Sequence, residues 1–318
     1  MSNIIKSILK NIFSVTNADA SHKLIRLCGI RFRILKPGNK KRIKINYKKY
    51  KDITQIPPAT GFLRDYQLAL LEILKEFDRI CTNHNLRYWL SGGTLLGAKR
   101  HKGFIPWDDD VDVDMIREDY EKVKVTFNAC TTNPDLYCEL WRDENAPATC
   151  ILKIHHKKIK QAFIDIFPHD FYYTKLLGKE KKRVNKKIRR IRKWLSLNPF
   201  RIKDTDKLLK KLKHLTLDVI NEKIEVDERI QPSIHWGIDF PHRWSNWIYD
   251  YSQIFPLKKI EFEGQMFNCP ADTDFMLRNI YGDYMKFPKS ICPHHTDENS
   301  FTDAEKAEIH KLISNKQK

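Results

Sequence analysis

The stretch that decides the fold is residues 88–115, which read YWLSGGTLLGAKRHKGFIPWDDDVDVDM. A short apolar run leads through Gly92-Gly93 into a helix-forming segment, and the stretch ends in aspartates that alternate with apolar residues. Alternation with period two predicts a strand, because successive side chains of a strand point to opposite faces. On this interpretation 107–115 is a strand, and one of its faces carries a row of carboxylates, those of Asp108, Asp110, Asp112 and Asp114.

A row of carboxylates on one strand face predicts a cation site. Like charges at that spacing repel one another unless a cation neutralises them. Carboxylate oxygens suit hard divalent ions, so we expect Mg²⁺ or Mn²⁺. The alternative is an acidic surface loop, for example a calcium loop. An EF-hand loop counted from Asp108 needs Gly at its sixth position and Glu at its twelfth, where this chain has Val113 and Asp119.

The Gly92-Gly93 pair indicates a place for a phosphate group. A strand that ends in Gly-Gly and opens a helix presents backbone N–H groups to an anion. A phosphate site that faces a cation site is typical of phosphoryl and nucleotidyl transfer. The residues expected to contact the phosphate or nucleotide of a donor are Ser91, Gly92, Gly93, Thr94, Arg100, Lys102 and Trp107. For the basic members of this set, and for Arg117, the alternative role is to balance the aspartate charges.

A third carboxylate is expected from a neighbouring strand. Asp165 lies in 162–168, AFIDIFP, where an acid interrupts an apolar run. An unpaired charge at such a position would be costly. Asp165 therefore either joins the cation site or forms a salt bridge with a core Lys or Arg.

The remaining pattern predicts a mixture of helices and strands. Apolar residues at three- and four-residue steps predict helices over 62–86, 94–100 and 272–281, and short apolar runs predict strands over 86–90, 136–142, 149–155 and 161–167. Near the N-terminus, the alternation of Ile30, Phe32 and Ile34 with arginines predicts a strand or hairpin.

Composition excludes several classes of protein. Of the 318 residues 41% are apolar, enough to build a core, so wholesale disorder is excluded. The sequence contains no apolar run of the roughly 18 to 20 residues that a membrane-spanning helix needs. The first residues also lack the hydrophobic block of a secretory signal. Seven cysteines without a C-x-x-C pair favour reduced, cytosolic thiols.

The net charge of +18 is concentrated in two basic segments. Residues 1–51 carry +13 and residues 175–213 carry +14, so the rest of the chain sums to −9. The first segment opens with an apolar stripe at helical spacing, which suits a membrane interface or packing on the body: Ile4, Ile5, Ile8, Leu9, Ile12 and Phe13. The second shows no recognition motif for nucleic acid. We therefore expect an anionic membrane surface as the partner and no nucleic acid.

Two further groups of residues carry weaker signals. His155-His156 and the group Cys292, His294 and His295 are candidate zinc ligands, but neither has a partner pair at standard spacing. Surface positions or contacts with substrate are the favoured interpretation for these histidines. A cluster of aromatic residues is expected in the core, with stacking on a sugar or around a quaternary ammonium as the alternative: Trp236, Phe240, Trp244, Trp247 and Tyr249.

Several long segments resemble one protein family. They read RDYQLALLEILKEFDRICTNHN (64–85), YWLSGGTLLGAKRHKGFIPWDDDVDVDMIREDYEK (88–122), AFIDIFPHD (162–170) and DTDFMLRNIYGDYMKFP (272–288). Together they resemble the LicD family of phosphotransferases, to which fukutin and the fukutin-related protein also belong. The resemblance extends over about residues 61–290, with gaps.

The resemblance implies an α/β fold, a nucleotidyltransferase-like mixed sheet flanked by helices. A basic segment (1–60) would precede a catalytic domain (61–318) that contains a helix-rich basic insertion at about 175–230. The implied catalytic carboxylates are Asp110, Asp112 and Asp165. The same three, with Asp108 from the predicted strand face, form the expected metal site. The pair Asp112 and Asp114 fits the acid spacing of the family as well as the pair Asp110 and Asp112 does.

The resemblance also implies a reaction. A phospho-substituent, in the first place phosphocholine, would pass from a CDP-linked donor to a hydroxyl of a cell-surface glycan, free or lipid-linked, and CMP would leave. The alternative within the same family is transfer of phosphoribitol or phosphoglycerol from a CDP-alditol. The alternative of another class is a nucleic-acid-binding protein that uses the basic segments. The expected location is cytoplasmic, peripheral at the inner face of the membrane.

Overall fold

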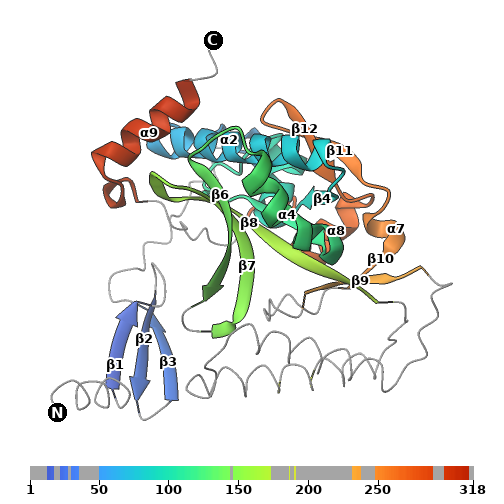
Figure 1. The fold of residues 1–318 in the computed structure, drawn as a ribbon, viewed down its shortest axis with the longest axis horizontal. Helices are drawn as coiled ribbons and strands as arrows, with labels where there is room; N and C mark the ends of the chain where they lie inside the picture. Colours follow the sequence, from blue (N-terminus) through green and yellow to red (C-terminus); the bar gives the residue numbers. More distant parts are fainter. Residues whose placement is uncertain are drawn as a thin grey trace.

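A seven-stranded mixed sheet lies at the centre of the fold in this computed structural model (Figure 1). The structure describes residues 13–17, 22–27, 30–35, 50–143, 146–172, 231–237, 248–288 and 297–314, and two isolated positions, Lys186 and Arg190. The strands of the central sheet are β4 (Tyr88–Leu90), β5 (Asp112–Ile116), β6 (Leu136–Asp143), β7 (Ala146–His156), β8 (Ile159–Tyr172), β9 (Ser233–Trp236) and β10 (Ile248–Asp250).

The long strand β8 organises this sheet. Its first part pairs antiparallel with β7, which in turn pairs with β6, and its last part pairs antiparallel with β9. Along its other edge β8 pairs with β5, and β5 pairs with β4. Among the strand pairs that the structure describes, β5 and β8 form the parallel one. The result is the predicted mixed sheet.

Helices cover the sheet, and those predicted over 62–86, 94–100 and 272–281 are among them. They are α2 (Phe62–Asn83), α3 (Gly92–His101), α4 (Arg117–Cys130), α7 (Tyr251–Ile254), α8 (Thr273–Tyr281) and α9 (Asp303–Ser314), with short 3₁₀ turns at Ile53–Gln55 and Glu298–Ser300. Figure 1 shows α2 and α4 over the sheet, with α9 beside α2. One side of β8 is fully buried beneath them through Ala162, Ile164 and Ile166, each 0% exposed.

Two smaller sheets accompany the central one. The strands β1 (Phe13–Asn17), β2 (His22–Leu27) and β3 (Ile30–Leu35) pair antiparallel in chain order, so the hairpin predicted around 30–35 is confirmed. The strands β11 (Lys258–Phe262) and β12 (Gln265–Cys269) form a second hairpin, which the sequence did not indicate.

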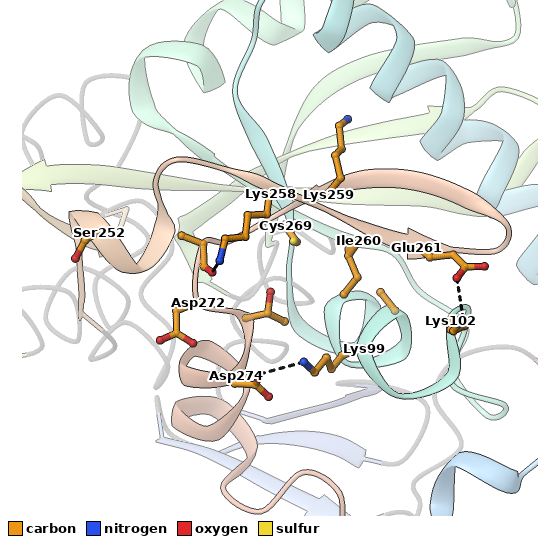
Figure 2. Close-up of a pocket in the computed structure, with 13 residues that line it drawn as sticks. Lys99, Lys102, Ser252, Lys258, Lys259, Ile260, Glu261, Cys269, Asp272 and Asp274 are labelled. Atoms are coloured by element: carbon orange, nitrogen blue, oxygen red, sulfur yellow. Dashed lines mark hydrogen bonds and ion pairs between the residues drawn. The ribbon is translucent and has the colours of Figure 1, made fainter.

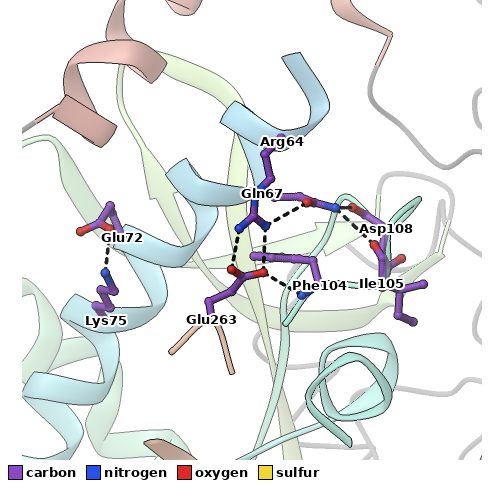
Figure 3. Close-up of polar contacts among 8 residues, drawn as sticks. All are labelled: Arg64, Gln67, Glu72, Lys75, Phe104, Ile105, Asp108 and Glu263. Carbon is purple, nitrogen blue, oxygen red and sulfur yellow. Dashed lines mark hydrogen bonds and ion pairs between the residues drawn. The ribbon is translucent and has the colours of Figure 1, made fainter. Parts of the chain in front are cut away.

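The predicted strand over 107–115 is wrong in its first half, because β5 begins only at Asp112. Residues 105–108 form a turn instead, in which the Asp108 N–H donates to the Ile105 carbonyl at 2.9 Å. Gln67 of α2, 0% exposed, donates to the carbonyls of Ile105 and Asp108 at 3.2 and 2.8 Å (Figure 3). These backbone carbonyls are therefore bound to a helix side chain.

Three expectations fall wholly or mainly outside the described residues: the amphipathic helix at the N-terminus, the basic insertion at about 175–230, and the group Cys292, His294 and His295. No helix within the described ranges is long and apolar enough to cross a membrane.

A partly buried ion pair between Arg64 and Glu263 fixes the β11–β12 hairpin to α2. Figure 3 shows the Arg64 guanidinium donating to both carboxylate oxygens of Glu263, at 2.8 and 2.7 Å. The same carboxylate accepts the Phe104 N–H at 3.0 Å, and the Glu263 N–H donates to the Lys102 carbonyl at 2.8 Å. One residue at the hairpin turn thus joins α2 to the segment that follows α3.

Replacing Glu263 should therefore destabilise the fold. We expect Glu263→Ala to lower the free energy of unfolding by about 1–3 kcal/mol, because it leaves a largely buried guanidinium and an amide without their acceptor. Urea unfolding followed by circular dichroism measures the change. The control is Lys286→Ala, which removes an exposed pair with Asp283 and should change stability by less than about 0.5 kcal/mol. Equal stability of the two variants would contradict this assignment.

Candidate active site

The parallel register of β5 and β8 brings two of the predicted carboxylates side by side. Asp112 is the Cα partner of Asp165, and the Asp165 N–H donates to the Val111 carbonyl at 2.9 Å. Residues opposite each other in neighbouring strands point to the same face. Residues 112 and 165, more than fifty positions apart in the sequence, therefore meet on one side of the sheet.

The glycine pair at the start of α3 lies against this face. Gly92 has a φ of 51°, and a Cβ built on it would meet the Asp112 carboxylate oxygen at 2.5 Å. A Cβ on Gly93 would overlap the carboxylate of Asp108. Both positions therefore need glycine so that backbone and carboxylates can approach closely. The approach is the predicted one, with the start of a helix facing the acidic segment.

Hydrogen bonds from the first turn of α3 hold β5 in place. The Asp112 N–H donates to the Thr94 hydroxyl at 2.9 Å, and the Ser91 N–H donates to the Asp112 carbonyl at 3.0 Å. Thr94 and Ser91 are both 2% exposed. Their side chains thus bind the protein itself, Thr94 at the Asp112 N–H and Ser91 at the Asp114 carboxylate. The contact of these residues and the glycines with a donor stays a prediction.

The cluster of carboxylates raises the pKa of Asp112 well above its usual value. Burial is the largest cause, followed by the charges of Asp110, Asp165, Asp108 and Asp114. The same aspartates affect two tyrosines. Burial and the charges of nearby aspartates raise the phenol pKa of Tyr66 and of Tyr281. A concentration of negative charge of this kind favours binding of a cation.

Asp114 has a different environment from Asp112. It is 0% exposed, and its carboxylate accepts the Ser91 hydroxyl at 2.8 Å and lies 3.0 Å from Nε2 of His169, which is also 0% exposed. Because its carboxylate is bound to these buried partners, Asp114 points into the protein interior. This geometry favours Asp110 and Asp112 over Asp112 and Asp114 as the metal-binding pair.

Asp165 has a lysine partner across the neighbouring strand. The Lys153 ammonium lies 2.7 Å from Asp165 Oδ1, and the two residues are Cα partners between β7 and β8. The Lys153 side chain is 8% exposed and that of Asp165 20% exposed. The expected alternative, a salt bridge with a nearly buried lysine, is therefore confirmed. Asp165 also lies beside Asp112, and its part in a cation site stays a prediction.

The donor set suits a hard divalent cation, because Asp108, Asp110 and Asp165 all lie close enough to Asp112 for their charges to raise the pKa of its carboxyl group. No three described residues here bring a ligand atom each within 4.8 Å of one another. The residues that would hold Mg²⁺ remain the four predicted aspartates.

The basic residues predicted to contact the donor differ in their surroundings. Arg100, 7% exposed, donates to the Tyr284 carbonyl at 3.0 Å and lies 5.9 Å from the ring centroid of Trp107. The charges of Arg100 and of the aspartates both act on the Tyr281 phenol, so Arg100 lies near the acidic cluster. Lys102 is exposed and pairs with Glu261 at 3.1 Å. Arg117, the other basic candidate, pairs with Asp170 at 2.7 Å.

Lys102 lines a separate pocket. The pocket lies between α3, the β11–β12 hairpin and the start of α8 (Figure 2). Its volume is about 680 Å³. Two of the lysines that line the pocket already have partners. The Lys99 ammonium lies 3.0 Å from Asp274, and the Lys258 ammonium donates to the Ala271 carbonyl at 2.7 Å. None of the predicted metal-binding aspartates lines this pocket.

The weaker sequence signals have structural explanations where the structure describes them. Nε2 of His155 lies 3.3 Å from Glu139. His156 is 2% exposed, so it is not a surface residue, and its ligand atoms lie within 4.8 Å of those of Asp135 and Glu308. The Lys158 ammonium lies 2.6 Å from Asp135, so these acids already have a cation beside them. Trp236 and Tyr249 are buried, as the core interpretation predicts.

Sequence reasoning missed four residues of the site: Tyr66, Lys153, His169 and Tyr281. Tyr66, His169 and Tyr281 lie inside the segments quoted for the family resemblance, so those segments were the available signal. Lys153 had no such signal, because a lysine in an alternating strand normally points to solvent.

Comparison with known proteins agrees with the family resemblance of the sequence. A family model described as "LicD/FKTN/FKRP, nucleotidyltransferase domain" matches residues 85–196. The chain is 30% identical over 259 residues to the lipopolysaccharide cholinephosphotransferase LicD of Haemophilus influenzae, which covers 74% of this chain and 97% of that protein. It is 62% identical over 51 residues to the human ribitol 5-phosphate transferase FKRP, covering 16% of this chain and 10% of that protein.

The raised pKa of Asp112 predicts how stability depends on pH. Folding disfavours the charged form, so Asp112 destabilises the metal-free protein as the pH rises above about 3.8, the usual value. In EDTA near neutral pH we expect Asp112→Asn to have a higher melting temperature than the wild type. The difference should shrink as the pH falls, because the wild-type carboxyl then becomes neutral as well. Differential scanning calorimetry measures both effects.

The matched control is Asp283→Asn, at an exposed carboxylate whose pKa is lowered by its hydrogen bond with Lys286. This variant should show no gain in melting temperature. A lower melting temperature for Asp112→Asn at every pH would show that the charge of Asp112 is compensated within the fold.

Proposed function

This chain belongs to the LicD family of phosphotransferases, and we propose that it transfers phosphocholine from CDP-choline to a hydroxyl of a cell-surface glycan and releases CMP. The observation that carries the proposal is the register of β5 and β8, which puts Asp112 beside Asp165 on a face that the Gly92-Gly93 backbone approaches. The choice of choline rests on the name of the Haemophilus influenzae relative.

In the proposed reaction the acceptor hydroxyl attacks the phosphorus that carries choline. The new P–O bond forms as the bond from that phosphorus to the oxygen of CMP breaks, and CMP leaves with the bonding electrons. Mg²⁺ held by the aspartates would offset the charge of the phosphate oxygens. The backbone N–H groups at the start of α3 are suited to orient the donor phosphate.

Asp165 is the favoured acceptor for the proton of the attacking hydroxyl. The Lys153 ammonium at 2.7 Å stabilises its ionised form, in which a carboxylate can accept a proton. Asp112 is less suited to this role, since burial and neighbouring charges already favour its protonated form. The two carboxylates would thus have different tasks, with Asp112 nearer the glycines and Asp165 nearer the acceptor.

A second candidate donor is a CDP-alditol. The human relative that is 62% identical over 51 residues is named as a ribitol 5-phosphate transferase. Transfer of phosphoribitol or phosphoglycerol would use the same carboxylates and the same leaving group. A nucleic-acid-binding role is the candidate of another class, and it rests on the basic segments alone.

Release of CMP tests the proposal directly. With Mg²⁺ and a glycan acceptor, we expect CMP to form faster from CDP-choline than from CDP-ribitol or CDP-glycerol. EDTA should stop the reaction, whereas a zinc-selective chelator should not, since the site offers oxygen ligands. Asp110→Asn should lower kcat by about a hundredfold or more, and Asp283→Asn should leave it unchanged. Full turnover in excess EDTA, or salt-sensitive binding of DNA or RNA without turnover, would overturn the proposal.

We also propose that the protein binds anionic membrane surfaces peripherally. The support is the distribution of charge, +13 in residues 1–51 and +14 in residues 175–213. Each basic residue near an anionic surface contributes up to about 1 kcal/mol, and salt screens this attraction. Liposomes with anionic lipids should therefore sediment the protein at low salt and release it at high salt. Equal retention by neutral liposomes would contradict this interpretation.

A further inference from the structure

The face of the sheet that carries Asp165 continues across β7 and β6. Asp165 is the Cα partner of Lys153, which is the partner of Glu139, so these three residues form one row across the strands. A second row, displaced by two residues along each strand, consists of Phe163, His155 and Tyr137. Both rows lie on the side of β8 opposite to the buried residues that pack under α2.

Aromatic rings cover this face next to Asp165. The ring centroids of Tyr137 and His155 are 5.5 Å apart, with an angle of 23° between the ring planes, and those of His155 and Phe163 are also 5.5 Å apart. Trp141 extends the face along β6, since its ring lies 4.8 Å from the Lys153 ammonium, and 37% of Trp141 is exposed. We call Tyr137, Trp141, His155 and Phe163 the aromatic strip.

Polar groups border the aromatic strip. The Glu139 side chain is 47% exposed and lies 3.3 Å from Nε2 of His155. Flat rings beside a solvent-accessible carboxylate suit a sugar, whose C–H faces can pack on the rings while its hydroxyls donate to the carboxylate.

The position of Lys153 argues against a cationic ligand such as the choline group of the donor. Its ammonium lies 3.6 Å from the ring centroid of Phe163 and 4.8 Å from that of Trp141, so these rings already have a cation against them. A second cation on the same rings would be repelled by the first. The strip therefore suits a ligand without positive charge.

We propose that the aromatic strip binds the acceptor glycan and delivers its hydroxyl to Asp165. The inference rests on the proposed function and adds a location for one of the two substrates. Asp165 lies between Asp112 on β5 and Lys153 on β7. Donor and acceptor then reach Asp165 from opposite sides, the donor from the glycines at the start of α3 and the acceptor along β6 and β7.

Binding to an array of bacterial lipopolysaccharide and capsular oligosaccharides tests the proposal without catalysis. The wild-type protein should bind a subset of these glycans, and Trp141→Ala and Tyr137→Ala should each weaken that binding by about tenfold or more. The control variant is Phe275→Ala, which removes an aromatic ring of similar exposure, 39%, from α8. It should bind the same glycans as the wild type does.

Slow release of CMP from CDP-choline without acceptor separates this proposal from the proposed function. Trp141→Ala and Tyr137→Ala should keep the wild-type rate and the wild-type KM for CDP-choline, while the KM for the best glycan of the array rises about tenfold. Absence of CMP release by the wild type both with and without acceptor would refute the proposed function, and the array result would still test the strip. Unchanged glycan binding in both variants, no glycan binding by the wild type, or a raised KM for CDP-choline would overturn the strip as the acceptor site.

Discussion

The parallel pairing of β5 with β8 is the constraint on which the rest of the structure depends. A parallel pair needs a long crossover connection, which here consists of α4, β6 and β7. The same pairing places Asp112 directly beside Asp165. A shift of one residue in this register would turn one carboxylate to the opposite face of the sheet. Fold and candidate chemistry are therefore determined together by a single strand pair.

The cost of gathering these carboxylates is offset by specific partners. Lys153 lies against Asp165, and His169 with the Ser91 hydroxyl holds Asp114 in the interior. For Asp112 the neighbouring charges add to the cost of burial, and its pKa is raised accordingly. The aspartates that look alike in the sequence thus differ in the structure. Asp114 is bound to buried partners inside the protein, whereas burial and neighbouring charges disfavour the ionised form of Asp112.

Much of this arrangement could be predicted from the sequence. Periodicity identified α2, α3, α8 and the strands β6 to β8, and the Gly-Gly pair predicted the close approach to the acidic segment. The predicted strand over 107–115 was too long, because Asp108, Asp109 and Asp110 follow one another directly and the alternation of aspartates with apolar residues begins only beyond them. The turn is stabilised by Gln67, whose side-chain amide donates to the carbonyls of Ile105 and Asp108 from a helix distant in the sequence. Tertiary contacts of this kind leave no local signal, and the same holds for the salt bridge of Lys153.

Because the first turn of α3 binds the backbone of Asp112 through Thr94 and Ser91, the elements next to the chemistry cannot move independently of one another. Substitutions there would disturb the carboxylates before they altered the choice of substrate. The strand β6, by contrast, carries exposed side chains such as Trp141 and Glu139. Over evolutionary time, descendants of such a protein could exchange one sugar for another at these positions while inheriting the reaction itself unchanged.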